Sequence, residues 1–172
     1  MTLSSTPGLA RFNTLADDEA TTALHEVCAS AAWGRAILSR RPYTTAEALL
    51  ATSDAAMAEL TREDLADAMA GHPPIGRPAP GDPTSSREQR GMAEAAEELK
   101  AEMLELNLAY QERFGHVFLI CATGATGEQM RDAAKSRIGN SPEQECEIVR
   151  TELGKINRIR LTRLVTEGEW RS

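Results

Sequence analysis

A histidine lies inside a short glycine- and proline-rich segment, and a glutamate follows it at the start of an expected helix. The two segments read Gly71-His72-Pro73-Pro74-Ile75-Gly76 and Ser85-Ser86-Arg87-Glu88-Gln89. An imidazole exchanges protons near neutral pH, and a carboxylate beside it can share that proton. His72 and Glu88 are therefore candidates for acid–base chemistry. The plainer interpretation, a surface loop whose histidine has no function, stays open.

The helices that would position these residues are marked by capping boxes, in which Glu or Gln follows Ser or Thr by three positions. The pairs are Thr44 with Glu47, Ser85 with Glu88, Thr126 with Gln129 and Ser141 with Gln144. A weaker start is expected at Thr61, and further helices are expected over residues 16–28 and 31–39. The run at residues 117–121 is typical of a strand, but a lone strand cannot form a sheet. We therefore predict an all-α fold.

The predicted fold is a single domain over residues 1–172, with about seven to eight helices and a long Pro/Gly-rich loop at residues 71–84. Two of the helices place a charge on an apolar stripe. The first stripe consists of Met92, Ala96, Leu99, Met103, Leu106 and Tyr110, and Glu88 precedes it in register. The second consists of Cys146, Val149, Leu153 and Ile156, and Arg160 follows it in register.

A buried guanidinium needs an anionic partner, because an unpaired buried charge is costly. Together with His72 and Glu88, Arg160 predicts a polar pocket for an anionic ligand. Both charges also have structural interpretations that the sequence leaves open. Glu88 can be a capping-box carboxylate, and Arg160 can extend to solvent or pair with a structural acid.

Composition and spacing argue against several other classes. The net charge of −7 disfavours nucleic-acid binding, and no apolar run is long enough to cross a bilayer. Three scattered cysteines and a start without signal-peptide features favour a cytoplasmic location. A dinucleotide-binding turn at residues 123–127 lacks its third glycine, since Met130 occupies that place. His25, His72 and His116 lack zinc-ligand spacing, so we predict no metal site.

Several segments together resemble the 2-oxo-4-hydroxy-4-carboxy-5-ureidoimidazoline (OHCU) decarboxylase family, which performs the last step from urate to (S)-allantoin. The matching segments are Phe12-Asn13-Thr14-Leu15, Trp33, Arg41-Pro42-Tyr43, residues 71–76, Ser85-x-x-Glu88-Gln89-x-Gly91, Tyr110-x-x-x-Phe114-Gly115-His116-Val117-Phe118-Leu119-Ile120 and Lys155-Ile156-Asn157-Arg158-Ile159-Arg160-Leu161. Any one of these would be weak alone, whereas the combination is specific.

This resemblance implies an all-α, cofactor-independent enzyme that forms a homodimer and takes a small-molecule substrate, OHCU. It implies that His72 and Glu88 are catalytic. The substrate-binding residues that it implies are Pro73, Ser85, Gln89, Phe118, Leu119, Ile120 and Arg160. Urate oxidase and hydroxyisourate hydrolase, which would supply the substrate, are candidate functional partners. The alternative from another class is a non-catalytic helical domain that binds a small anion or another protein.

Overall fold

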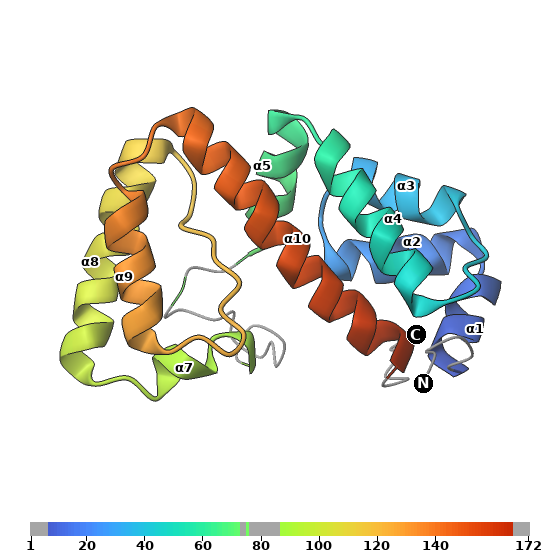
Figure 1. The fold of residues 1–172 in the computed structure, drawn as a ribbon, viewed down its shortest axis with the longest axis horizontal. Helices are drawn as coiled ribbons and strands as arrows, with labels where there is room; N and C mark the ends of the chain where they lie inside the picture. The colour runs from blue at the N-terminus through green and yellow to red at the C-terminus, as the bar shows by residue number, and fades with distance from the viewer. Residues whose placement is uncertain (1–6, 73–74, 76–86, 167–172) are drawn as a thin grey trace. The chain divides into compact units, whose positions relative to one another are not determined.

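The computed structural model describes residues 7–72, 75 and 87–166, and it forms nine helices and no strand within them. The helices are α1 (Pro7–Thr14), α2 (Asp17–Val27), α3 (Ala31–Ser39), α4 (Ala46–Glu59), α5 (Arg62–Ala70), α7 (Arg90–Ala93), α8 (Glu97–Phe114), α9 (Gly127–Arg137) and α10 (Pro142–Thr166) (Figure 1). The predicted all-α fold is confirmed.

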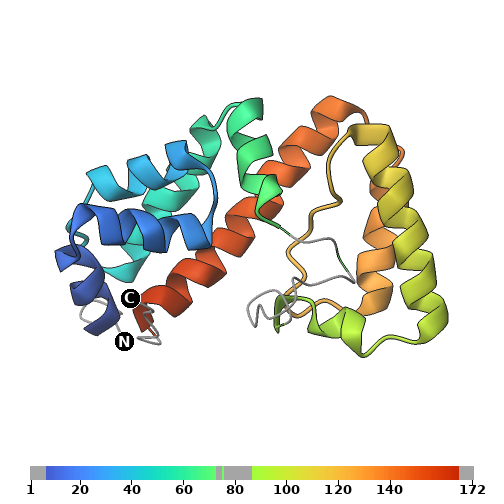
Figure 2. The ribbon, with the colours of Figure 1, turned by 180° about the vertical axis from the view of Figure 1, so that it is seen from behind.

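The described helices form two compact units. Unit 1 comprises residues 1–68 and 154–172, and unit 2 comprises residues 69–153, so α10 contributes to both. In unit 1, α3 packs against α2 and α4, and the C-terminal part of α10 lies beside these helices (Figure 2). Trp33 is fully buried there, and its indole N–H donates a hydrogen bond to Ser53 Oγ over 3.1 Å. This bond satisfies the polar end of the largest core side chain.

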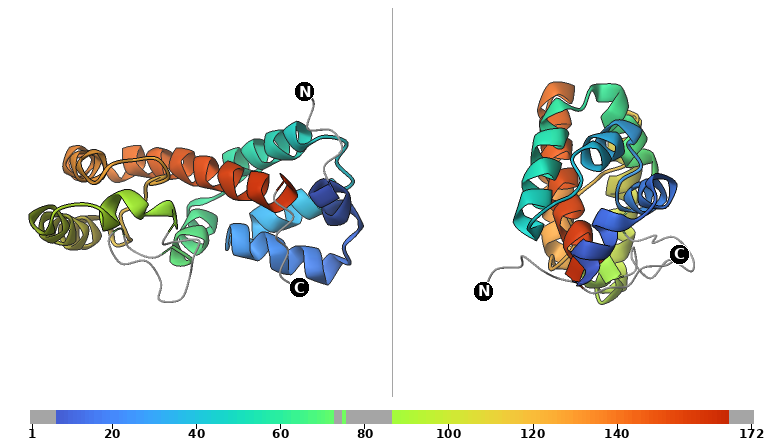
Figure 3. Two further views of the ribbon diagram at one scale, coloured as in Figure 1. Left: turned by 90° about the horizontal axis from the view of Figure 1, so that it is seen from below. Right: turned by 90° about the vertical axis from the view of Figure 1, so that its right-hand side faces the viewer.

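In unit 2, α8 and α9 pack side by side (Figure 3). Gly115 ends α8 with a φ of 81°, a left-handed conformation that glycine adopts without strain. The chain then returns along the helices to the start of α9 (Figure 1). The core here contains three methionines; its buried members are Ile75, Met92, Met103, Tyr110, Phe118, Ala122, Met130 and Ala134.

The helix starts confirm three of the predicted caps, whereas Ser85 of the predicted Ser85–Glu88 pair lies outside the described residues. Thr126 and Gln129 form a complete capping box at α9, and Ser141 and Gln144 exchange the same two bonds at α10. Thr61 caps α5, with Asp64 returning the second bond. The predicted capping box of Thr44 with Glu47 is wrong. Thr45 caps α4 by accepting a hydrogen bond from the Ala48 N–H, because the helix begins at the buried residue Ala46.

One expected helix is divided in two. The stripe from Met92 to Tyr110 predicts a single helix, whereas the structure breaks it at residues 94–96 and makes Ala96 the exposed N-cap of α8. Both α7 and α8 pack on α9, and the chain changes direction between them, which a single straight helix could not do. This break and the unanticipated helix α1 account for the helices beyond those expected.

Candidate functional site

His72 follows the end of α5 and is half-buried. Its backbone N–H donates to the Met69 carbonyl over 3.0 Å, which closes the last turn of the helix. Ile75 is buried, and its carbonyl accepts a hydrogen bond from Asn107 Nδ2 on α8 over 2.7 Å. A buried side chain of α8 therefore anchors the backbone just beyond His72. The predicted substrate-binding residues Pro73 and Ser85 lie outside the described residues.

Glu88 and Gln89 precede α7, and both side chains are buried, with exposures of 8% and 6%. The inward direction expected for Glu88 is therefore confirmed. Glu88 also lines a pocket of about 680 Å³, together with Arg87, Arg90 and the turn at residues 123–127. The pocket wall is tight, because a Cβ at Gly91 would overlap the carbonyl oxygen of Ala125. A glycine is required at this close approach of two backbones.

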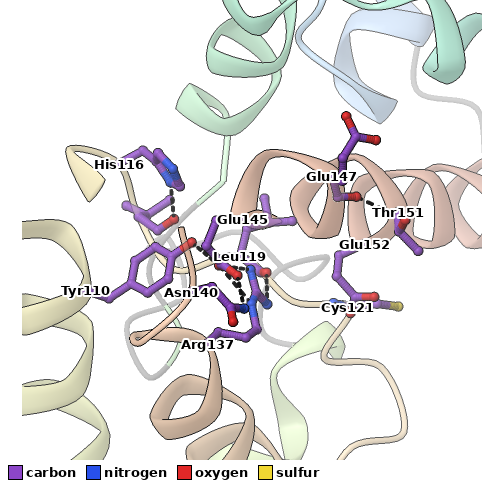
Figure 4. Close-up of polar contacts among 11 residues, drawn as sticks. Tyr110, His116, Leu119, Cys121, Arg137, Asn140, Glu145, Glu147, Thr151 and Glu152 are labelled. Atoms are coloured by element: carbon purple, nitrogen blue, oxygen red, sulfur yellow. Dashed lines mark hydrogen bonds and ion pairs between the residues drawn. The ribbon is translucent and has the colours of Figure 1, made fainter. Parts of the chain in front are cut away.

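The segment that joins α8 to α9 carries three predicted substrate-binding residues. Phe118 and Leu119 are buried, whereas Ile120 is half-buried. The segment has no regular secondary structure in place of the strand considered for residues 117–121. Side chains supply its backbone partners: Arg137 Nη1 donates to the Leu119 carbonyl over 2.8 Å, and the Cys121 N–H donates to Glu152 Oε1 over 3.1 Å (Figure 4).

Arg160 lies on the part of α10 that belongs to unit 1, and it is half-buried. Its Nη1 donates to the carbonyl of Val27, at the end of α2, over 2.9 Å. The neighbouring Cys28 is buried, and this burial raises the pKa of its thiol, although the Arg160 charge acts in the opposite direction. Arg160 is thus in one unit while His72 and Glu88 are in the other. Its action on the same substrate stays a prediction.

The described residues form neither a metal-binding cluster nor a membrane span. No group of three or more His, Cys, Asp or Glu side chains within them is arranged to hold a metal ion. None of the helices described is long and apolar enough to cross a membrane.

Comparison with known proteins decides the family. The OHCU decarboxylase family matches residues 13–162, which include every predicted site residue and parts of both units. The chain belongs to this family. The resemblance inferred from the combined segments between Phe12 and Leu161 is therefore confirmed.

Curated relatives have names from uric acid degradation. The uric acid degradation bifunctional protein TTL of Arabidopsis thaliana is 29% identical over 147 residues, covering 81% of this chain and 45% of the relative. The bifunctional protein PucL of Bacillus subtilis is 28% identical over 129 residues, covering 74% and 26%. A 2-oxo-4-hydroxy-4-carboxy-5-ureidoimidazoline decarboxylase of Amia calva is 38% identical over 65 residues, covering 38% and 37%. The chain thus spans less than half the length of these curated relatives.

Solved structures share the fold. A crystal structure of OHCU decarboxylase in the presence of (S)-allantoin superposes with a TM-score of 0.73 at 27% identity, covering 88% of this chain and 99% of that one. A crystal structure of (S)-allantoin synthase superposes with a TM-score of 0.68 at 18% identity, covering 91% and 54%. At that identity the second match supports the fold alone.

Unit 2 also contains a buried polar network that the sequence did not predict. Glu145 is fully buried, and its Oε1 lies 2.9 Å from both Arg137 Nε and Nη2. The same oxygen accepts a hydrogen bond from the Tyr110 hydroxyl over 2.5 Å, while Oε2 accepts one from Asn140 Nδ2 over 2.9 Å (Figure 4). Periodicity contained a signal for this network, since Glu145 precedes Val149 by one helical turn on the buried face of α10.

The network shifts the ionisation of its members in opposite directions. Burial alone would raise the pKa of Glu145, but hydrogen bonds from Arg137, Asn140 and Tyr110, with the Arg137 charge, hold that pKa below its ordinary value. Burial and the bond to the Glu145 carboxylate raise the pKa of Tyr110 well above its ordinary value. At neutral pH Glu145 is therefore a carboxylate and Tyr110 a neutral phenol.

Proposed function

We propose that this chain decarboxylates OHCU to (S)-allantoin and CO2 in the degradation of uric acid, without a cofactor. The family match over residues 13–162 carries the proposal, because it includes the histidine, glutamate and arginine segments together. The relatives named for uric acid degradation and the structural neighbour crystallised in the presence of (S)-allantoin support it.

The chemistry of this substrate explains why few protein groups suffice. The departing carboxylate leaves a carbon next to a ring C=N bond, so the released electron pair moves into that bond and the substrate supplies its own electron sink. The protein must orient the carboxylate, stabilise the charge that develops on the ring and deliver one proton to one face.

Three side chains take these roles in the proposal. His72 contacts the ring hydroxyl and assists proton movement, so that the product carbon is protonated stereospecifically. Glu88 partners His72 or the substrate from its buried position, where its like charge would destabilise the substrate carboxylate and so favour its loss as CO2. Arg160 binds an anionic or carbonyl oxygen. The remaining substrate contacts come from Pro73, Ser85, Gln89 and the backbone of residues 118–120.

The wider setting is part of the same proposal. We propose that residues 1–172 act as one domain, that the protein works as a cytoplasmic homodimer and that urate oxidase and hydroxyisourate hydrolase supply its substrate. Size-exclusion chromatography with light scattering tests the dimer: a monomer mass at working concentration would refute it.

Optical activity tests the reaction, because spontaneous decay of OHCU produces racemic allantoin. Urate oxidase and hydroxyisourate hydrolase generate the substrate in place, and circular dichroism follows the (S)-allantoin signal. We expect rapid signal with the wild-type protein and at least a hundredfold slower signal with His72→Asn. His25→Asn, an exposed histidine on α2, is the matched control and should retain wild-type rate. Wild-type signal at the background rate would favour the non-catalytic binding domain.

The role of Arg160 has its own control on the same helix. Arg158 is exposed and pairs with Asp54, so Arg158→Lys should leave the steady-state constants unchanged. Arg160→Lys loses the planar fork that binds a carboxylate through two bonds, and we expect KM to rise about tenfold or more. Equal constants for the two variants would make Arg160 a structural residue.

A further inference from the structure

The half-buried residue Ile120 lies between two points at which side chains hold the backbone. On one side, Arg137 from α9 holds the carbonyl of Leu119, and on the other, Glu152 from α10 holds the N–H of Cys121 (Figure 4). Both contacts lie within unit 2. One side chain is a donor and the other an acceptor, so the two residues fix the segment through opposite backbone groups.

These two contacts matter because no strand pairs with the segment. Among the described residues, no hydrogen bond reaches the N–H or carbonyl of Ile120 itself. A backbone N–H or carbonyl without a protein partner is satisfied by a ligand or by water. The position of the Ile120 peptide is then determined by its two neighbours and by the packing of the Phe118 ring.

Arg137 is itself rigidly held. Its side chain is 8% exposed, and its guanidinium contacts Glu145 through both Nε and Nη2. The guanidinium carbon lies 4.6 Å from the centre of the Phe118 ring, and that ring packs edge-on against Tyr110. One guanidinium therefore fixes both a carbonyl and a ring of the same segment, which a flexible lysine could not do.

We propose that Arg137 and Glu152 are positioning residues that hold the Ile120 peptide in place for the substrate, with Glu145 acting through Arg137. The proposal rests on the proposed function, in which the backbone of residues 118–120 contacts OHCU. A displacement of about 1 Å in a substrate-orienting group can lower the rate a hundredfold, so the two contacts have kinetic consequences beyond stability.

Glu152 offers the sharpest test because it is half-buried and its contact needs only an acceptor. Glu152→Gln keeps an acceptor oxygen for the Cys121 N–H, whereas Glu152→Met removes it at similar length. We expect Glu152→Met to lower kcat/KM about tenfold or more and Glu152→Gln to restore it to within about threefold. Glu147→Met, an exposed position on the same helix, is the control and should match the wild type.

Hydrogen exchange links the kinetics to the backbone. The peptide that contains Cys121 should exchange faster in Glu152→Met and at the wild-type rate in Glu152→Gln. Arg137→Lys should likewise lower kcat/KM, whereas Arg131→Lys on the same helix should not. If Arg137→Lys does not fold, the Glu152 series decides the proposal without it.

The outcomes separate this proposal from the proposed function. A wild-type protein without stereospecific turnover refutes the proposed function, and the positioning role is refuted with it. An active wild type together with a Glu152→Met variant of unchanged kcat and KM refutes the positioning role alone. A variant that loses thermal stability but keeps both constants in its folded fraction shows that the contact is only structural, which also overturns the proposal.

Discussion

Replacing Glu145 with Gln should destabilise unit 2 far more than the same change at Glu147, an exposed acid on the same helix. Four polar groups contact the two oxygens of the wild-type carboxylate. Arg137 Nε, Arg137 Nη2 and the Tyr110 hydroxyl contact Oε1, and Asn140 Nδ2 donates to Oε2. A Gln amide has one oxygen and one NH2 group, so the NH2 must face donors in either orientation.

The magnitude follows from burial. The side chain of Glu145 has no exposed area and that of Arg137 is 8% exposed, so the guanidinium would lose its counter-charge where little water can replace it. Removing one partner of a buried ion pair costs about 3–5 kcal/mol. Tyr110→Phe removes a single hydrogen bond to a charged group and keeps the pair, so we expect a smaller cost, about 1.5–3 kcal/mol.

Urea denaturation followed by far-ultraviolet circular dichroism measures these free energies of unfolding. Glu147→Gln is the control, because Glu147 is exposed and its contact with Arg150 lies at the surface; it should cost less than about 1 kcal/mol. A cost below about 1 kcal/mol for Glu145→Gln as well would refute the inference that the buried pair stabilises unit 2.

Glu145→Gln should also change how the free energy of unfolding depends on pH in acid. The folded-state pKa of Glu145 lies below its ordinary value of 4.5, so the unfolded chain binds this proton at a higher pH than the folded chain. Its contribution to stability is therefore complete above pH 4.5 and is lost as the pH falls through the folded pKa. Wild-type stability should fall more steeply than that of Glu145→Gln below pH 4.5. Parallel profiles would contradict this assignment.

Two further substitutions test the packing around the site. Gly91→Ala would drive a Cβ into the carbonyl oxygen of Ala125, so we expect the free energy of unfolding to fall by about 1–3 kcal/mol, as measured by thermal unfolding. Gly139→Ala is the control and should be nearly neutral, because a Cβ there meets no atom within 4 Å. Similar losses for both variants would contradict the close approach of Gly91 to Ala125. Asn107→Leu would leave the buried Ile75 carbonyl without its donor and should cost about 1–3 kcal/mol while also lowering turnover; unchanged turnover by the circular dichroism assay would show that this anchor does not position His72.

The helix starts were predictable because their signals are local. Thr126 and Ser141 each carry, within three residues, both side chains that a capping box requires, and the structure forms both boxes. Thr44 fails the same rule because Thr45 is an equally good cap, and burial of Ala46 selects between them. The break before α8 was not predictable in this way, since it depends on packing against α9, a helix distant in the sequence.

The inward charges show where periodicity stops being informative about function. Periodicity predicts that Glu88 faces the core, and Glu88 is buried although the predicted helix is broken after it, but periodicity does not identify the partner. Glu145 occupies the same kind of position on α10, and its partners come from α8, α9 and the turn before α10. Because those contacts require the fold, an inward acid that belongs to the framework and one that belongs to a site have the same sequence pattern. Arg137 belongs both to the framework and to the proposed site, since the guanidinium that neutralises Glu145 also donates to the carbonyl of Leu119.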